Sequence, residues 1–269
     1  MKQVPLNHAD SYATFREYLE GLRTRFADRE ALVSYTPKGQ RQSLTFHQLH
    51  QKVQALSEMF RVTLPDGHAA IVSENSPEWF ILYLALIISG HTAVCIDTEQ
   101  SDEVIASMIA QADCTSVFLS PSYTSAITLI RQNHPGVQRI ITLGEEGADS
   151  LPALLQSGLQ LVRSHHGQWS FPDHDGSFTA SIVYTSGTTS LSKPVMLSEI
   201  GILTNAADSM RLVTVGDTVF TSLPFYHTYG LTCSVINMLL HGSTVGINGS
   251  LKTMMRDLKA FAPQTMMAV

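Results

Sequence analysis

The chain has 269 residues, of which 44% are apolar and 15% are charged, and its formal net charge is −6. This composition is typical of a globular protein with a sizeable core and excludes a disordered chain. Without a basic excess, the chain is not expected to bind nucleic acid or an anionic membrane surface, although a local nucleotide site is compatible with this charge.

Cysteine usage and hydropathy indicate a cytoplasmic protein without a membrane span. The three cysteines (Cys95, Cys114 and Cys233) are scattered, which disfavours a disulfide framework. Residues 1–12 lack the apolar core of a signal peptide. The most apolar run, 79–88, is about half the ~20 residues that a membrane-spanning helix needs, so we expect a buried helix there.

The first predicted elements are helices that alternate with short strands. Thr45 and Gln48 form a capping-box pattern that opens a helix to about residue 60. An apolar strand follows at 69–72, and Ser76-Pro77-Glu78 carries the signals of a helix start, with Gly90 available to end that helix. The same alternation continues with a strand at 91–96, a helix opened by Ser101, and strands at 115–119 and 138–143.

A polar segment with glycine and proline, 163–177, interrupts this alternation and is predicted to connect two α/β halves, 1–162 and 178–269. Its histidines, His165, His166 and His174, are expected to be solvated. The second half reads as a strand at 181–185, a helix at 199–210, a strand at 219–223, a helix at 231–240, a strand at 244–247 and a final apolar run at 265–269. The predicted fold class is therefore α/β, with two βαβ-type halves and mostly parallel sheets.

The most informative stretch is Tyr-Thr-Ser-Gly-Thr-Thr-Ser-Leu-Ser-Lys at 184–193, which follows an apolar strand. Backbone amides and hydroxyls in a tight loop can wrap phosphate oxygens, and Lys193 adds a positive charge. The loop is not a Walker A motif, because GxxxxGK[ST] is absent. A flexible Ser/Thr linker is the alternative reading.

This stretch resembles the phosphate-binding loop of the adenylate-forming enzymes, which include acyl- and aryl-CoA synthetases, adenylation domains of peptide synthetases and luciferase. The family pattern is Tyr-Thr-Ser-Gly-Thr-Thr-Gly-x-Pro-Lys-Gly. Further motifs are similar in the same order: Leu-Thr-Phe-His-Gln-Leu at 44–49, the strand from Gly90 to Asp97, and Leu-Pro-Phe-Tyr-His-Thr-Tyr-Gly-Leu at 223–231. The resemblance implies the large N-terminal domain of such an enzyme, with its second half incomplete.

The resemblance implies an AMP-forming acid–thiol ligase that uses ATP and Mg²⁺. A fatty or aryl carboxylate would attack the α-phosphate of ATP, giving an acyl-adenylate and pyrophosphate, and coenzyme A or a carrier protein's phosphopantetheine would then take the acyl group. By position, the phosphate-binding residues are Thr185, Ser186, Gly187, Thr188, Thr189, Ser190 and Lys193. Thr188 is the implied Mg²⁺ ligand. Lys193 would offset the charge on the leaving pyrophosphate, and His227 would line the junction of acyl pocket and adenylate.

The alternative for His227 is a core histidine beside Phe225, Tyr226 and Tyr229. A histidine in this apolar, aromatic motif favours a fatty- or aryl-acid enzyme over an amino-acid adenylation domain. No HExxH motif or paired Cys/His spacing indicates a structural metal site.

Several positions depart from the family pattern. Ser190 and Pro194 stand where the family has glycine, Ser192 stands where it has proline, and Glu199 replaces a histidine or similar residue. Serine at a position that needs positive φ costs on the order of 1 kcal/mol, and proline removes a backbone donor. These changes keep a second reading open, in which the chain is a catalytically silent binding or scaffold module.

The family's Tyr-Gly-x-Thr-Glu motif does not occur in the chain, nor do the ribose-binding aspartate and the lysine of the small C-terminal domain. We therefore expect a fragment that needs C-terminal segments of the same polypeptide and is inactive alone. A third reading is an adenylating module that loads a carrier protein.

Overall fold

The computed structural model describes residues 10–144, 147, 149–185 and 193–268, which form two compact units. Unit 1 contains Met1–Leu49, Asn75–Pro77 and Ile200–Val269, and unit 2 contains His50–Glu74 and Glu78–Glu199. Each unit has its own sheet, and both sheets are mostly parallel. The predicted α/β class is confirmed.

Unit 2 is built on a sheet with the strand order β6-β5-β3-β4-β7-β8. All neighbours in it are parallel except the last pair, β7 and β8, which is antiparallel. The strands are β3 (His68–Val72), β4 (Thr92–Cys95), β5 (Cys114–Leu119), β6 (Arg139–Thr142), β7 (Thr179–Thr185) and β8 (Lys193–Ser198).

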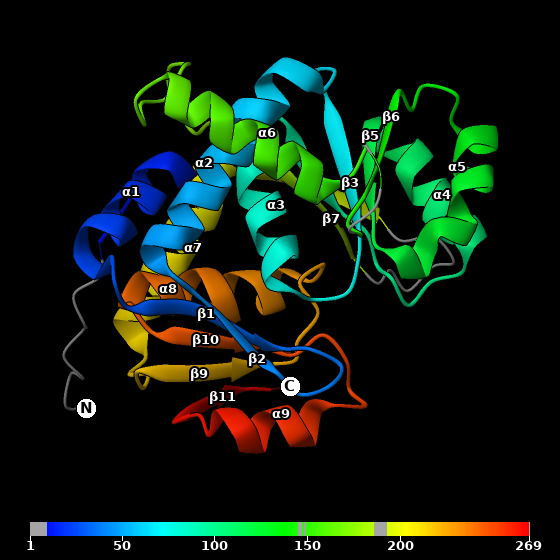
Figure 1. The fold of residues 1–269 in the computed structure, drawn as a ribbon. Coiled ribbons are helices and arrows are strands. Elements are labelled where there is room, and N and C mark those ends of the chain that lie inside the picture. Colours follow the sequence, from blue (N-terminus) through cyan, green and yellow to red (C-terminus); the bar gives the residue numbers. More distant parts are fainter. Residues whose placement is uncertain (1–9, 145–146, 148, 186–192, 269) are drawn as a thin grey trace, which may run out of the picture. The chain divides into compact units, whose positions relative to one another are not determined.

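Helices cover both faces of this sheet. The helical elements are α2 (Phe46–Thr63), α3 (Pro77–Ile88), α4 (Asp102–Gln111), the 3-10 helix η1 (Pro121–Ala126), α5 (Ile127–Asn133) and α6 (Leu151–Ser164). Alternate strand residues such as Val72, Val94 and Ile182 pack with α4 and α5 in one apolar cluster. On the other face, Phe60 of α2 meets Phe118 of β5. α6 crosses α2 (Figure 1), and Gly158 of α6 lies against the Ala55 carbonyl of α2.

Local sequence signals set several helix ends. The amide of Thr45 donates to the Gln48 side chain at 2.9 Å, and the amide of Gln48 donates to the Thr45 hydroxyl at 3.2 Å, so the predicted capping box is present. Pro77 is the first residue of α3, and Gly90, just beyond the end of α3, has a φ of +88°. The residues of the apolar run 79–88 are buried in α3, as predicted.

Unit 1 has the strand order β11-β9-β10-β1-β2, with β2 antiparallel to β1 and the other pairs parallel. Its strands are β1 (Glu30–Tyr35), β2 (Arg41–Thr45), β9 (Thr218–Thr221), β10 (Thr244–Ile247) and β11 (Thr265–Met267). Its helices are α1 (Phe15–Phe26), α7 (Glu199–Leu212), the π-helix η2 (Tyr229–Ile236), α8 (Asn237–His241) and α9 (Met254–Phe261). Residues 231–240, predicted as one helix, fall in η2 and α8.

The structure divides the chain differently from the predicted halves 1–162 and 178–269. β7 pairs with β4 and so completes the sheet of the preceding strands, while β1 pairs with β10 from much later in the chain. The segment 163–177 lies within unit 2, where the main-chain amide of Ser170 donates to Glu58 of α2 at 2.8 Å.

One prediction for this segment is wrong. His165 and His166 are exposed as expected, but His174 is not a solvated side chain. Its imidazole forms a 3.0 Å ion pair with Glu199, whose side chain is fully buried. The sequence does not reveal this partner, because Glu199 lies 25 residues after His174, at the start of a later helix.

Candidate functional site

The predicted phosphate loop joins the two strands of the β7–β8 hairpin. Thr185, the last residue of β7, pairs in register with Lys193, the first residue of β8. The Thr185 hydroxyl donates to the Lys193 carbonyl at 3.4 Å. The other predicted phosphate-binding residues, Ser186, Gly187, Thr188, Thr189 and Ser190, lie outside the described residues, so their roles remain predictions.

The hairpin places Thr185 and Lys193 at one edge of the unit 2 sheet. β7 runs parallel to β4 and β3, so the carboxyl ends of all three strands meet at this edge. Open parallel sheets bind ligands beyond the carboxyl ends of their strands. Both residues are exposed, so the ammonium group of Lys193 is accessible to an anion.

The core anchors the β7 strand of this hairpin. The Tyr184 hydroxyl donates to the Met108 carbonyl of α4 at 2.6 Å, and burial raises the pKa of this phenol. The phenol therefore stays a neutral donor. Tyr184 fixes the strand one residue before Thr185.

Pro194 lies within β8 and is the register partner of Tyr184. β8 is the edge strand of its sheet, which is where a strand tolerates the missing N–H of proline. The ring also holds the φ of residue 194 in a narrow range, so the chain after Lys193 is restricted. The departure at 194 thus fits the hairpin. Ser190 and Ser192 lie outside the described residues.

His227, in unit 1, lies in the tight segment between β9 and η2. Its amide donates to the Pro224 carbonyl at 3.2 Å, its carbonyl accepts from the Leu231 amide at 3.0 Å, and its side chain is exposed. The core-histidine reading is therefore wrong. The rings of Tyr226 and His227 meet edge to face with centroids 4.7 Å apart.

The aromatic residues around His227 divide into two groups. Phe225 and Tyr226 are buried, whereas Tyr229 is 44% exposed. Only Tyr229 and His227 can therefore offer much surface to a ligand here, while Phe225 belongs to the core. The segment 223–231 contains no Asp, Glu, Lys or Arg, so the surface that it exposes is neutral or apolar.

Two further residues, Asn75 and Gly230, shape this segment. The Asn75 amide group donates to the Leu223 carbonyl at 2.8 Å, and its oxygen accepts from the Phe225 amide at 2.9 Å. A Cβ on Gly230 would lie 2.1 Å from the Pro224 carbonyl oxygen, so this position requires glycine. Gly230 belongs to the 223–231 motif that the sequence analysis identified, whereas no local pattern in the sequence marks Asn75.

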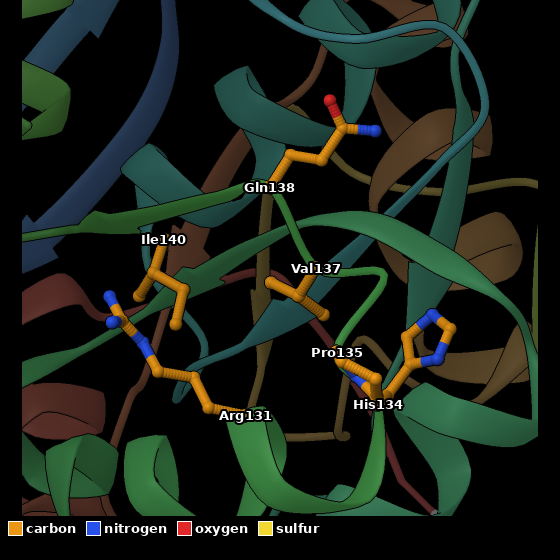
Figure 2. A pocket seen from close by; sticks show the side chains of 6 residues that line it. All are labelled: Arg131, His134, Pro135, Val137, Gln138 and Ile140. Carbon is orange, nitrogen blue, oxygen red and sulfur yellow. The ribbon is translucent and has the colours of Figure 1, made fainter.

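A separate hollow of about 320 Å³ lies where α5 leads into β6 (Figure 2). Figure 2 shows Val137 between the Arg131 and His134 side chains, with Ile140 beside the end of the Arg131 side chain. The lining residues are Arg131, His134, Pro135, Val137, Gln138 and Ile140. Because β6 begins here and is parallel to β5, this hollow is at the amino edge of the sheet, opposite Thr185 and Lys193. It is not part of the predicted phosphate site.

Among the described residues, no three His, Cys, Asp or Glu side chains cluster so that they could hold a metal ion. The implied Mg²⁺ ligand, Thr188, is outside the described range. None of the helices in the described part of the chain is long and apolar enough to cross a membrane.

Comparison with known proteins gives a consistent match. The family described as "AMP-binding enzyme" matches residues 20–269. A long-chain-fatty-acid–CoA ligase of Cavia porcellus is 23% identical over 218 residues, which cover 74% of this chain and 31% of that protein. This chain thus spans about a third of the length of that relative.

Solved structures match the fold over nearly the whole chain. A long-chain-fatty-acid–CoA ligase from Archaeoglobus fulgidus superposes with a TM-score of 0.82 at 18% identity, covering 98% of this chain and 53% of that one. ATP-bound MatB from Rhodopseudomonas palustris gives a TM-score of 0.73 at 23% identity, covering 93% of this chain and 48% of that one. At these identities, the structural matches establish the fold.

Proposed function

Because this chain belongs to the AMP-binding enzyme family, we propose that it supplies the phosphate-binding part of an AMP-forming acid–thiol ligase. The observation that carries the proposal is the β7–β8 hairpin, which brings Thr185 and Lys193 into register at the carboxyl edge of a parallel sheet. Its connecting residues resemble the family's phosphate loop and depart from it at Ser190 and Ser192.

The proposed reaction has two steps. A carboxylate oxygen attacks the α-phosphorus of ATP, which forms the acyl-adenylate and breaks the bond to pyrophosphate. A thiolate of coenzyme A or of a carrier's phosphopantetheine then attacks the acyl carbon and releases AMP. Negative charge grows on the pyrophosphate in the first step, and a lysine at its oxygens stabilises that charge.

Lys193 is proposed to contact the β- and γ-phosphates together with Thr185, Ser186, Gly187, Thr188, Thr189 and Ser190. The fit of the described residues to an anion is good: Lys193 is exposed at the edge, and no described acidic residue forms an ion pair with it. Mg²⁺ would supply further charge neutralisation at Thr188. The Thr185 hydroxyl also donates a hydrogen bond to the Lys193 carbonyl across the hairpin.

The proposed acid is fatty or aryl. The His227 segment offers exposed imidazole and phenol rings at His227 and Tyr229 and carries no carboxylate that would pair with the ammonium group of an amino acid. The relatives that match include ligases named for long-chain fatty acids, and these names support the same class.

A panel of acids tests this proposal. Protein expressed from the entire reading frame is assayed for pyrophosphate release with MgATP and fatty, aryl or amino acids, and with coenzyme A or carrier protein as acceptor. We expect turnover with a fatty or aryl acid. Preference for an amino acid contradicts the substrate class, transfer only to a carrier identifies a loading module, and ATP binding without turnover identifies a silent relative.

A further inference from the structure

A buried ion pair lies at the end of β8 that is distant from Lys193. Nδ1 of His174 is 3.0 Å from Oε2 of Glu199. The Glu199 side chain has no exposed surface, and that of His174 is 25% exposed. Glu199 directly follows Ser198, the last residue of β8. The pair therefore holds the point at which β8 leads into α7.

The contacts of His174 fit its charged form beside an ionised Glu199. Nε2 is 3.3 Å from the carbonyl oxygen of Ile87, so one ring nitrogen faces this carbonyl and the other faces the Glu199 carboxyl group. A neutral imidazole has one N–H, whereas the imidazolium has two. Beside an ionised Glu199, the imidazolium can place one N–H toward each of these two oxygens. The ring also packs edge to face against Phe178, with centroids 4.5 Å apart.

Helix ends favour both charges of this pair. Ile87 lies in the last turn of α3, where the partial charge is negative, and Glu199 is the first residue of α7, where it is positive. Burial alone would lower the pKa of His174, but its hydrogen bond with Glu199 and that residue's charge outweigh burial and raise this pKa.

The other titratable groups near the pair do not compete with it. Asp173 adds negative charge beside His174, and Asp175 feels the histidine's positive charge in turn. On α3, Tyr83 lies near Glu199, and burial raises the pKa of its phenol well above the ordinary value, so it stays neutral. Every charged neighbour of His174 thus favours its protonation.

β8 has few other anchors. Four of its six residues, Lys193–Met196, are exposed, and only Leu197 and Ser198 are half-buried. Its backbone pairs with β7 on one side, and its other side is the edge of the sheet. Because core packing does little to hold β8, an ion pair at its end should restrict the motion of this strand more than it would restrict a strand whose side chains are buried.

We propose that His174 is a positioning residue, whose imidazolium holds Glu199 and thereby fixes β8 and its first residue, Lys193, the phosphate-binding lysine. The expected effect on ATP binding rests on the proposed function, whereas the expected effect on β8 is independent of it.

The proposal implies a pH dependence with a definite sign. The pKa of His174 in the folded chain is raised above the ordinary value of 6.5, so its contribution is complete below that value. The contribution is lost as the pH rises through the raised pKa. β8 should therefore loosen on the alkaline side.

Hydrogen exchange without nucleotide tests the link to β8. Protection factors of the β8 amides, corrected for intrinsic exchange, are measured from about pH 6 to about pH 9 in the unmodified chain, where we expect a decrease of about tenfold. His174→Gln should show the low protection at every pH. His165→Gln, an exposed histidine of the same segment, is the matched control and should behave like the unmodified chain. Protection that is independent of pH in the unmodified chain, or unchanged in His174→Gln, would overturn the proposal.

ATP affinity tests the second link. At about pH 6, His174→Gln should weaken MgATP binding about three- to tenfold relative to His165→Gln. Looser β8 amides with unchanged ATP affinity would show that the pair is structural only and would overturn the positioning role. Absence of ATP binding by unmodified protein expressed from the entire reading frame would overturn the proposed function, and the exchange data would still decide whether the pair holds β8.

Discussion

β7 and β8 are neighbours in one sheet, yet their side chains lie in opposite environments. Ile182 of β7 and Met196 of β8 are register partners, so their side chains lie on the same face of the sheet. Ile182 is 4% exposed and Met196 is 70% exposed. The apolar cluster with α4 includes Ile182 and does not extend to its partner.

Within this hairpin, β7 contributes to the stability of the fold, whereas β8 presents the residue proposed to bind phosphate. β7 is held by burial and by the Tyr184 hydrogen bond to α4, and it ends at Thr185. β8 buries little, begins with Lys193 and ends at the His174–Glu199 pair. A strand whose side chains are not packed in the core can present a polar residue to a ligand, because core packing does not require an apolar residue at that position.

The largest expected effect tests the buried side of this comparison. Ile182→Ala removes a side chain from the core cluster and should lower the free energy of unfolding by about 2–5 kcal/mol. Met196→Ala, at the partner position, should change it by less than about 0.5 kcal/mol. Urea unfolding of both variants measures the contrast, and similar losses would refute the division between the two strands.

A smaller effect is expected at Tyr184. Tyr184→Phe keeps the ring in the core but removes the donor to the Met108 carbonyl, which should cost about 1 kcal/mol. Midpoints of urea unfolding at constant slope give this value. A variant as stable as the parent would mean that the hydroxyl does not anchor β7.

The smallest effect on stability is expected at Lys193. Lys193→Ala changes an exposed side chain at the beginning of an edge strand, so the free energy of unfolding should move by less than about 0.5 kcal/mol. Thermal unfolding of the variant beside its parent is sufficient to measure this. A loss as large as that of Tyr184→Phe would show that the lysine has a structural role.

Local patterns in the sequence predicted the elements that local physics determines. The Thr45–Gln48 capping box, the proline at the start of α3 and the short apolar strands of unit 2 were each predicted from neighbouring residues and were confirmed. For the same reason, the β7 strand and the family resemblance were accessible: they depend on contiguous residues.

Long-range pairing was not accessible from the sequence. β8 is mostly exposed, and its apolar residues Val195, Met196 and Leu197 are consecutive, so it lacks the apolar–polar alternation that predicts a strand. It forms because its backbone pairs with β7. The compact units depend on β1 meeting β10 and on β7 meeting β4. The Glu199 partner of His174 and the Asn75 clamp on 223–225 likewise join residues that no local pattern connects.

Calorimetric titration of protein expressed from the entire reading frame with MgATP tests the central claim most directly. The account predicts saturable binding that Lys193→Ala weakens about tenfold or more, because a charged hydrogen bond to phosphate contributes about 1.5–3 kcal/mol. Lys259→Ala, an exposed lysine on α9, is the matched control and should bind like the parent. Equal affinities for the parent and Lys193→Ala, or no binding by the parent, would contradict the assignment of the β7–β8 hairpin as the phosphate site.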